Sequence, residues 1–186
     1  MESLVARGAV SVRELALPDG ARVPVRVLQV RFGRATPDRL PEGALPATYT
    51  SKPLVSVAGD AMFGELAVVR WLERDGWEAV WVDALHGRKF WRAMPHRSEP
   101  VRLPPLAQAR YDAVVAANGG RASGFFDVLA WRGAQLAHLE YRGPGERAGR
   151  AEAGWVAAAL TAGASPHELW IVRCGEPDDD EPAAGA

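Results

Sequence analysis

The sequence predicts a mixed α/β domain in which helices cover a largely buried sheet. Segments with helical periodicity alternate with short apolar runs, as expected of this fold class. A tight reversal at Gly133-Ala134 joins two apolar strands. The helix expected at 147–162 lies between two strands and therefore makes a crossover connection. With 186 residues, of which 48% are hydrophobic, the chain has enough material for one core.

The first part of the chain, residues 1–58, is predicted to form a β-hairpin and a proline-rich linker. Apolar and polar residues alternate from Val10 to Phe32 around a turn at Pro18-Asp19-Gly20. Prolines are then frequent up to Pro53 and exclude long regular elements. The main domain is expected at 59–174. The acidic tail 175–186, rich in Pro, Gly and Ala, is expected to be disordered.

The segment from residue 60 to residue 173 supplies the elements of the main domain. Asp60 is expected to cap a helix that Gly76 ends, with Glu65 on its apolar side. Glu65 then either lies at a solvated edge or leans over the sheet. The further elements are a strand 77–85, a basic turn 86–89, a helix 105–118, a hairpin 126–142, a helix 147–162 and a strand 167–173.

The hairpin 126–142 places two carboxylates opposite each other. A two-residue loop with glycine first pairs Val128 with Leu139 and Asp127 with Glu140. The neighbouring residues are apolar on both faces, which is typical of buried strands. Two buried like charges need a shared proton, a basic partner or a divalent metal. Arg142, on the same face as Glu140, is a candidate partner.

Two plainer interpretations of the acidic pair stay open. Asp127 can open a strand at the surface and Glu140 can end one, each paired with an arginine such as Arg142, because surface ion pairs are common. The chain can also be an α/β domain of unrelated chemistry in which the pair arises by chance.

Composition excludes several classes of protein. The formal net charge of -1 argues against indiscriminate coating of nucleic acid by bulk electrostatics. Cys174 is the single cysteine, so the chain can form no intrachain disulfide and shows no zinc-type Cys pattern. No apolar run typical of a signal peptide or a membrane span begins the chain. We therefore expect a cytoplasmic protein with no membrane partner.

The segment 124–173, GFFDVLAWRGAQLAHLEYRGPGERAGRAEAGWVAAALTAGASPHELWIVR, resembles the second half of the PD-(D/E)XK nuclease superfamily, specifically its VRR-NUC branch. Asp127 matches the aspartate of that family and Glu140 the glutamate of its E-x-K element. Arg142 falls where lysine is expected. Glu65 resembles the acidic residue on the first helix of the family.

The resemblance implies both a fold and an activity. The fold is a restriction-endonuclease-like mixed sheet flanked by helices, to which the N-terminal β-hairpin is a small extension. The activity is metal-dependent hydrolysis of phosphodiester bonds in nucleic acid, with DNA as the expected substrate in repair, restriction or defence. A homodimer is expected by analogy with related nucleases.

The resemblance also implies roles for the matching residues. Asp127 and Glu140 hold Mg²⁺ or Mn²⁺ together with the backbone carbonyl of Tyr141, and Glu65 binds a second ion or orients the attacking water. Arg142 cannot act as a base, although it can stabilise charge in the transition state. Lys89 on the basic turn can substitute for the missing lysine.

Two departures from the family pattern predict impaired or altered cleavage and leave an alternative function open. Arg142 replaces the lysine, and Glu152 stands where the branch has a glutamine. The alternative is a catalytically degenerate nuclease-fold module that acts in DNA binding or protein interaction. For either function, the residues expected to contact nucleic acid are basic and lie on turns or helix N-termini: Arg88, Lys89, Arg147 and Arg150.

Overall fold

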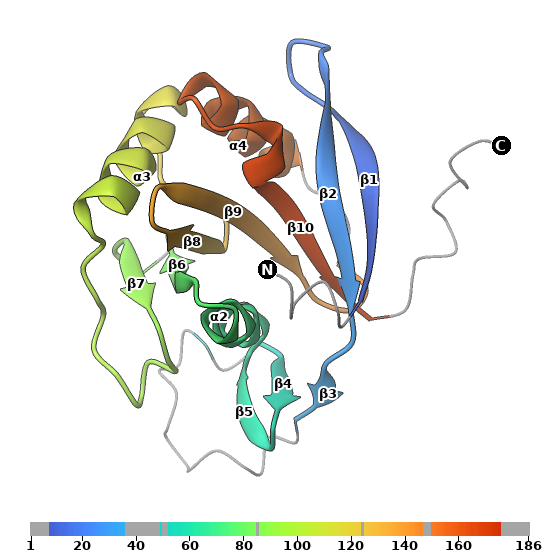
Figure 1. Cartoon of the computed structure of the whole chain (residues 1–186), viewed down its shortest axis with the longest axis vertical. Helices are drawn as coiled ribbons and strands as arrows, with labels where there is room; N and C mark the ends of the chain where they lie inside the picture. Colours follow the sequence, from blue (N-terminus) through green and yellow to red (C-terminus); the bar gives the residue numbers. More distant parts are fainter. Residues whose placement is uncertain are drawn as a thin grey trace, which may run out of the picture.

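A seven-stranded mixed sheet with helices on both faces forms the body of the protein (Figure 1). The structure is a computed structural model and describes residues 8–35, 49, 52–84, 86–123, 125–146 and 150–175. The predicted α/β fold class is confirmed. The predicted acidic tail after Gly175, most of the predicted linker and Arg147 lie outside the described residues.

The strands of the main sheet lie in the order β1-β2-β10-β9-β8-β6-β7. Their bounds are β1 Gly8–Ala16, β2 Arg22–Val30, β6 Glu78–Asp83, β7 Lys89–Trp91, β8 Val128–Arg132, β9 Gln135–Arg142 and β10 Leu169–Cys174. A three-stranded sheet lies apart from it, with strands β3 Gly33–Arg34, β4 Leu54–Val57 and β5 Asp60–Phe63. The helical elements are α2 Gly64–Arg74, α3 Pro105–Ala117, α4 Arg150–Thr161 and a 3₁₀ turn Pro166–Glu168.

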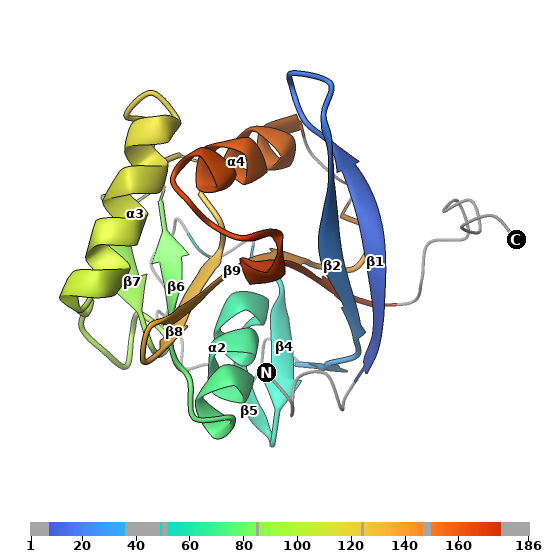
Figure 2. The same cartoon turned by 45° about the horizontal axis from the view of Figure 1, so that its top comes forward.

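Each face of the main sheet has its own apolar core. Figure 2 shows α3 and α4 on one face of the sheet and α2 on the other. Leu66 and Val69 of α2 pack with Val128 and Leu139. On the opposite face, strand residues such as Leu129 pack against α3 and α4. The sheet is thus covered on both sides, as its continuous apolar strands predict.

The predicted N-terminal hairpin is present as β1 and β2, which pair antiparallel. Strand β2 also pairs parallel with β10, so the hairpin adds two strands to the edge of the main sheet. Val25 and Leu28 of β2 are buried in the two cores. The hairpin therefore continues the sheet instead of standing apart from it.

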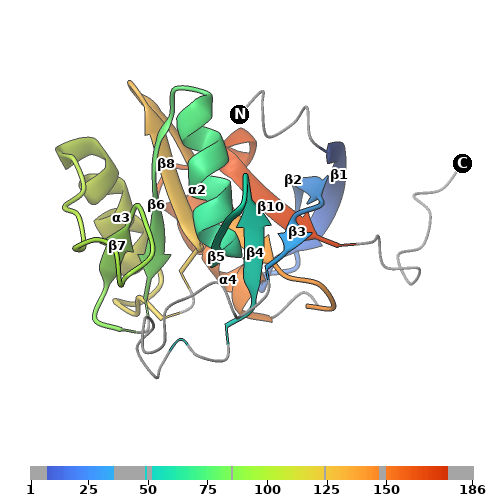
Figure 3. The same ribbon diagram turned by 90° about the horizontal axis from the view of Figure 1, so that it is seen from below.

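Helix α2 begins later than the sequence indicates. Asp60 does not cap this helix; it opens β5 and pairs with Val57 of β4. Ala58 and Gly59 both have positive φ, 54° and 92°, and form the turn that reverses the chain between these strands. The helix can start only after β5 ends, at Gly64. Figure 3 shows α2 lying beside the small sheet.

The predicted register of the second hairpin is confirmed. Val128 pairs with Leu139 and Arg132 with Gln135, so Gly133 and Ala134 form a two-residue loop. The φ of Gly133 is 58°, a conformation that glycine adopts without strain. Strand β9 then pairs parallel with β10 across helix α4, which confirms the predicted crossover.

Gly64 allows α2 to approach β9 closely. A Cβ atom at this position would overlap the ring of Tyr141, whose side chain packs on the α2 face. Gly154 in α4 offers a contrast, because a Cβ there meets no atom within 4 Å.

We predict opposite effects of alanine at these two helical glycines. Gly64→Ala should lower the free energy of unfolding by about 1–3 kcal/mol, because the new methyl group overpacks the contact with Tyr141. Gly154→Ala should raise it by up to about 1 kcal/mol, since alanine is the better helix former. Urea unfolding of both variants checks this, and a Gly64→Ala protein as stable as the wild type would contradict it.

Candidate active site

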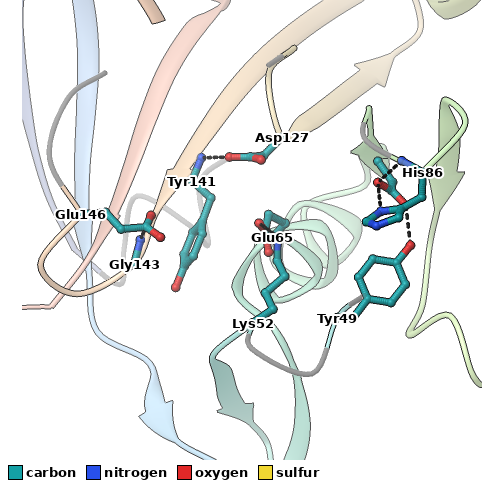
Figure 4. Close-up of polar contacts among 9 residues, drawn as sticks. Tyr49, Lys52, Glu65, His86, Asp127, Tyr141, Gly143 and Glu146 are labelled. Atoms are coloured by element: carbon teal, nitrogen blue, oxygen red, sulfur yellow. Dashed lines mark hydrogen bonds and ion pairs between the residues drawn. The ribbon is translucent and has the colours of Figure 1, made fainter. Parts of the chain in front are cut away.

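Asp127 directly precedes β8 and is held by backbone groups of β9 and β6, the strands on either side of β8. Its side-chain Oδ2 accepts a hydrogen bond of 2.9 Å from the backbone N–H of Tyr141 in β9 (Figure 4). Its backbone carbonyl accepts one of 2.8 Å from Val82 of β6. Glu140 directly precedes Tyr141 and lies one position beyond the last paired residues of β8 and β9. The structure thus brings Asp127 and Glu140 to adjacent positions, as the register predicts.

The carboxyl groups of Asp127 and Glu140 hold their protons more tightly than usual. Burial is the largest cause for both residues and raises the pKa of each well above its ordinary value. The charge of Glu65 raises the pKa of Asp127 further, and the charge of Asp127 does the same to Glu140. These acids therefore behave as one electrostatic cluster.

Glu65 joins this cluster from helix α2. It occupies the first turn of the helix, where the backbone dipole favours negative charge. The residue is 4% exposed, which excludes a solvated edge position. Its Oε1 lies 2.5 Å from Nζ of Lys52, while its buried Oε2 has no hydrogen-bond partner among the described residues. Figure 4 shows Glu65 and Lys52 on the side of the site toward which the Tyr141 ring points.

Lys52 is a site residue that the sequence pattern did not indicate. It lies two residues before β4, and its Nζ is 5.0 Å from the ring centre of Trp81 and 5.6 Å from that of Phe63. Burial opposes the charged form of Lys52, but the carboxylates of Glu65 and Asp127 outweigh it and raise the lysine pKa. A protonated ammonium group therefore stands beside the acids.

Arg142 points to a different partner from the one expected. Its guanidinium forms a buried ion pair with Glu152 of α4. The charge of Arg142 still lowers the pKa of Glu140, although burial of Glu140 outweighs this effect. The two residues that depart from the family pattern, Arg142 and Glu152, are thus bound to each other.

A second polar cluster lies at the same end of the main sheet as Asp127. Asp83, the last residue of β6, accepts hydrogen bonds from the Tyr49 hydroxyl at 2.5 Å and from the backbone N–H of His86 at 3.1 Å. The ring Nδ1 of His86 also lies 2.9 Å from its carboxylate. Figure 4 shows this cluster beyond Lys52. No sequence pattern indicated this cluster, because Tyr49 lies 34 residues before Asp83 along the chain.

The basic residues proposed for nucleic-acid contact are only partly placed. Arg88 and Lys89 are exposed in the turn that follows β6, and Lys89 pairs with Asp83 as β7 begins. Arg150 is the first residue of α4. Glu146, an acid not foreseen, accepts a hydrogen bond of 2.8 Å from the backbone of Gly143 and adds negative charge near Asp127.

The donor set is compatible with a hard divalent cation. The carboxylates of Asp127, Glu140 and Glu65 repel one another, and Glu65 Oε2 is a buried acceptor without a donor among the described residues. Such oxygen ligands are those preferred by Mg²⁺ and Mn²⁺. Within the described ranges, no three or more His, Cys, Asp or Glu side chains come close enough together to hold a metal ion by themselves. Backbone carbonyls and water would have to supply the remaining ligands.

Comparison with known proteins returns no relative. No family model, curated protein or solved structure matches the chain. In the part of the chain that the structure describes, no helix has the length and apolar character needed to cross a membrane.

We predict that Asp127→Asn stabilises the protein in a pH-dependent way. Below the ordinary pKa of aspartate, the side chain is protonated in both folded and unfolded states, so the substitution changes little. Above it, the unfolded chain releases a proton that folded Asp127 retains, so wild-type stability falls until pH passes the raised pKa. The variant should therefore gain about 1 kcal/mol or more relative to wild type between pH 4 and pH 8, since each pKa unit is worth about 1.4 kcal/mol.

Urea unfolding of both proteins across this range gives the measurement. If the unfolding free energies of Asp127→Asn and wild type differ by the same amount at pH 4 and at pH 8, the pKa of Asp127 is not raised.

Proposed function

We propose that the protein is a metal-dependent nuclease that hydrolyses phosphodiester bonds of nucleic acid, with DNA as the substrate. The observation that supports this most is the electrostatic interaction among Glu65 of α2, Asp127 directly before β8 and Glu140 of β9. Acids at these positions are the ones that the resemblance to PD-(D/E)XK nucleases implies.

The order of elements agrees with the same proposal. Helix α2 precedes the strands β6, β8 and β9. Strand β8 pairs antiparallel with both β6 and β9, and helix α4 then leads to β10, which is parallel to β9. The part from β8 to β10 lies almost entirely within residues 124–173, whose layout carries the resemblance to the second half of that family. Fold alone does not define an activity, so the carboxylates remain the main support.

Each acid would have a distinct task. Asp127 and Glu140 would bind Mg²⁺ or Mn²⁺ with the backbone carbonyl of Tyr141, and the hydrogen bond from the Tyr141 amide fixes the Asp127 carboxylate for this. The bound ion would acidify a water molecule and polarise the phosphate. Glu65, held from α2, would orient that water through its Oε2, which has no hydrogen-bond partner in the part of the chain that the structure describes.

The surroundings favour an anionic polymer as substrate. The exposed basic turn with Arg88 and Lys89 follows β6 directly, at the end of the strand where Val82 bonds to Asp127. Basic side chains on such a turn position phosphates. Because the net charge of the chain is -1, this attraction is local.

The test compares wild type with Asp127→Ala. We expect Mn²⁺ to bind wild type in a calorimetric titration, and linear or branched DNA to be nicked in the presence of the metal. Asp127→Ala should lose metal binding and cleavage, because it removes a ligand. Asp112→Ala is the matched control, since Asp112 is an exposed aspartate on α3 that bonds to Gln108.

The outcomes separate the two functions considered. Metal binding that requires Asp127, but without cleavage of DNA or RNA, would favour the catalytically degenerate module that binds DNA or protein. Identical behaviour of wild type and Asp127→Ala would remove the site assignment altogether.

A further inference from the structure

We propose that Lys52 supplies the cationic group that faces the scissile phosphate, in place of the motif position occupied by Arg142. The inference rests on the proposed nuclease function of the same site. It concerns a lysine from the segment before β4, outside the resemblance at 60–173.

The placement of Lys52 is built from several contacts. Its Nζ is 2.5 Å from Glu65 Oε1 and lies within 6 Å of the ring centres of Phe63 and Trp81. Trp81 pairs with Val128, the residue that follows Asp127. Aromatic faces attract a cation and fix its position. The ammonium group is therefore held on the α2 face of the sheet, against Glu65 and near Asp127.

Arg142 is committed elsewhere. Its buried ion pair with Glu152 joins β9 to α4, on the face of the sheet opposite to α2. Tyr141, the neighbouring residue in β9, projects to the α2 face and packs against Gly64. Moving Arg142 to a phosphate on the α2 face would leave Glu152 as a buried unpaired charge, which is strongly destabilising.

Lys89, the other lysine of the chain, is less well placed. It is exposed, and its Nζ lies 5.9 Å from the ring centre of Trp91 in the same strand, β7. No contact of Lys89 with the acids is seen in the described part of the chain. Lys89 is thus suited to a phosphate further along the nucleic acid.

The chemistry asked of Lys52 is electrostatic. In hydrolysis the oxygen of water forms a bond to phosphorus as the bond from phosphorus to the leaving oxygen breaks; the water gives its proton to solvent and the leaving oxygen takes one from solvent. An ammonium group has three N–H donors. One can bond Glu65 while another donates to a non-bridging phosphate oxygen, where negative charge grows. Lys52 keeps its proton throughout.

The experiment measures single-turnover cleavage of DNA in Mn²⁺ by wild type, Lys52→Ala and Arg92→Ala. Arg92 is the matched control because it too is a cation that pairs with a carboxylate, Glu78 at 2.7 Å, and lies near an indole, Trp131. Glu78 opens β6, so this pair lies at the end of the strand opposite to Asp83. Lys52→Ala should cleave about 10²- to 10³-fold more slowly while still binding Mn²⁺, and Arg92→Ala should cleave like wild type.

Two further measurements separate a chemical role from a structural one. Methylammonium added to Lys52→Ala should restore part of the cleavage rate, because it can fill the space of the lost ammonium group; a folding defect would not respond. The double variant Lys52→Ala/Arg142→Lys should stay as slow as Lys52→Ala. If Lys52→Ala does not fold, Lys52→Arg serves instead, and it should retain more than a tenth of the wild-type rate.

Different results would overturn the assignment of Lys52 and the proposed nuclease function. Lys52→Ala that cleaves as fast as an active wild type, or a rate restored by Arg142→Lys, would overturn the assignment of Lys52 and leave the nuclease proposal standing. A Lys52→Arg protein that folds but cleaves less than a tenth as fast also counts against the assignment. A wild-type protein that binds Mn²⁺ but cleaves no nucleic acid would overturn both proposals.

Discussion

The crowding of negative charge at the end of β8 and β9 is the constraint on which the rest of the site depends. Asp127 directly precedes β8 and Glu140 lies in the neighbouring β9, and the charge of Glu65 on α2 makes both of these acids harder to ionise. Burial adds to this cost, because water cannot solvate the ionised oxygens fully. A protein that keeps such a cluster gives up stability that neutral residues would provide. A bound divalent cation would offset that cost, which links the geometry of the fold to the proposed activity.

Cations already present in the chain reduce the repulsion in two different ways. Lys52 contacts Glu65 directly and remains charged beside the acids. Arg142 lies two residues beyond Glu140 on the same face of β9, and its charge lowers the pKa of Glu140 while it stays paired with Glu152. Lys52 keeps N–H donors beside Glu65, whereas the ion pair of Arg142 with Glu152 holds β9 against α4. The ion pair with Glu152 accounts for an arginine at position 142, because this arginine stabilises the contact between β9 and α4.

Local sequence signals predicted the elements whose structure depends on neighbours in the chain. The glycine at position 133 and the apolar strands around it were enough to fix the register that sets Asp127 opposite Glu140. The predicted start of α2 was wrong. Asp60 is a good helix cap in isolation, but it pairs with Val57 and therefore belongs to β5. Lys52 could not be found, because its contact with Glu65 arises from tertiary structure and has no sequence spacing to mark it. The pairing of Arg142 with Glu152 was hidden for the same reason, although both residues stood out as departures.

The proposed metal site requires that Asp127 and Glu140 ionise when a cation binds. Carboxyl-carbon NMR with labelled Asp and Glu, assigned through Asp127→Asn and Glu140→Gln, gives the pKa of each group with and without Mg²⁺. We predict that both pKa values lie well above 5 in the absence of the metal and fall when Mg²⁺ is added, because the bound cation stabilises the ionised forms. Two carboxyl groups that titrate near pH 4 and do not respond to Mg²⁺ would contradict the account.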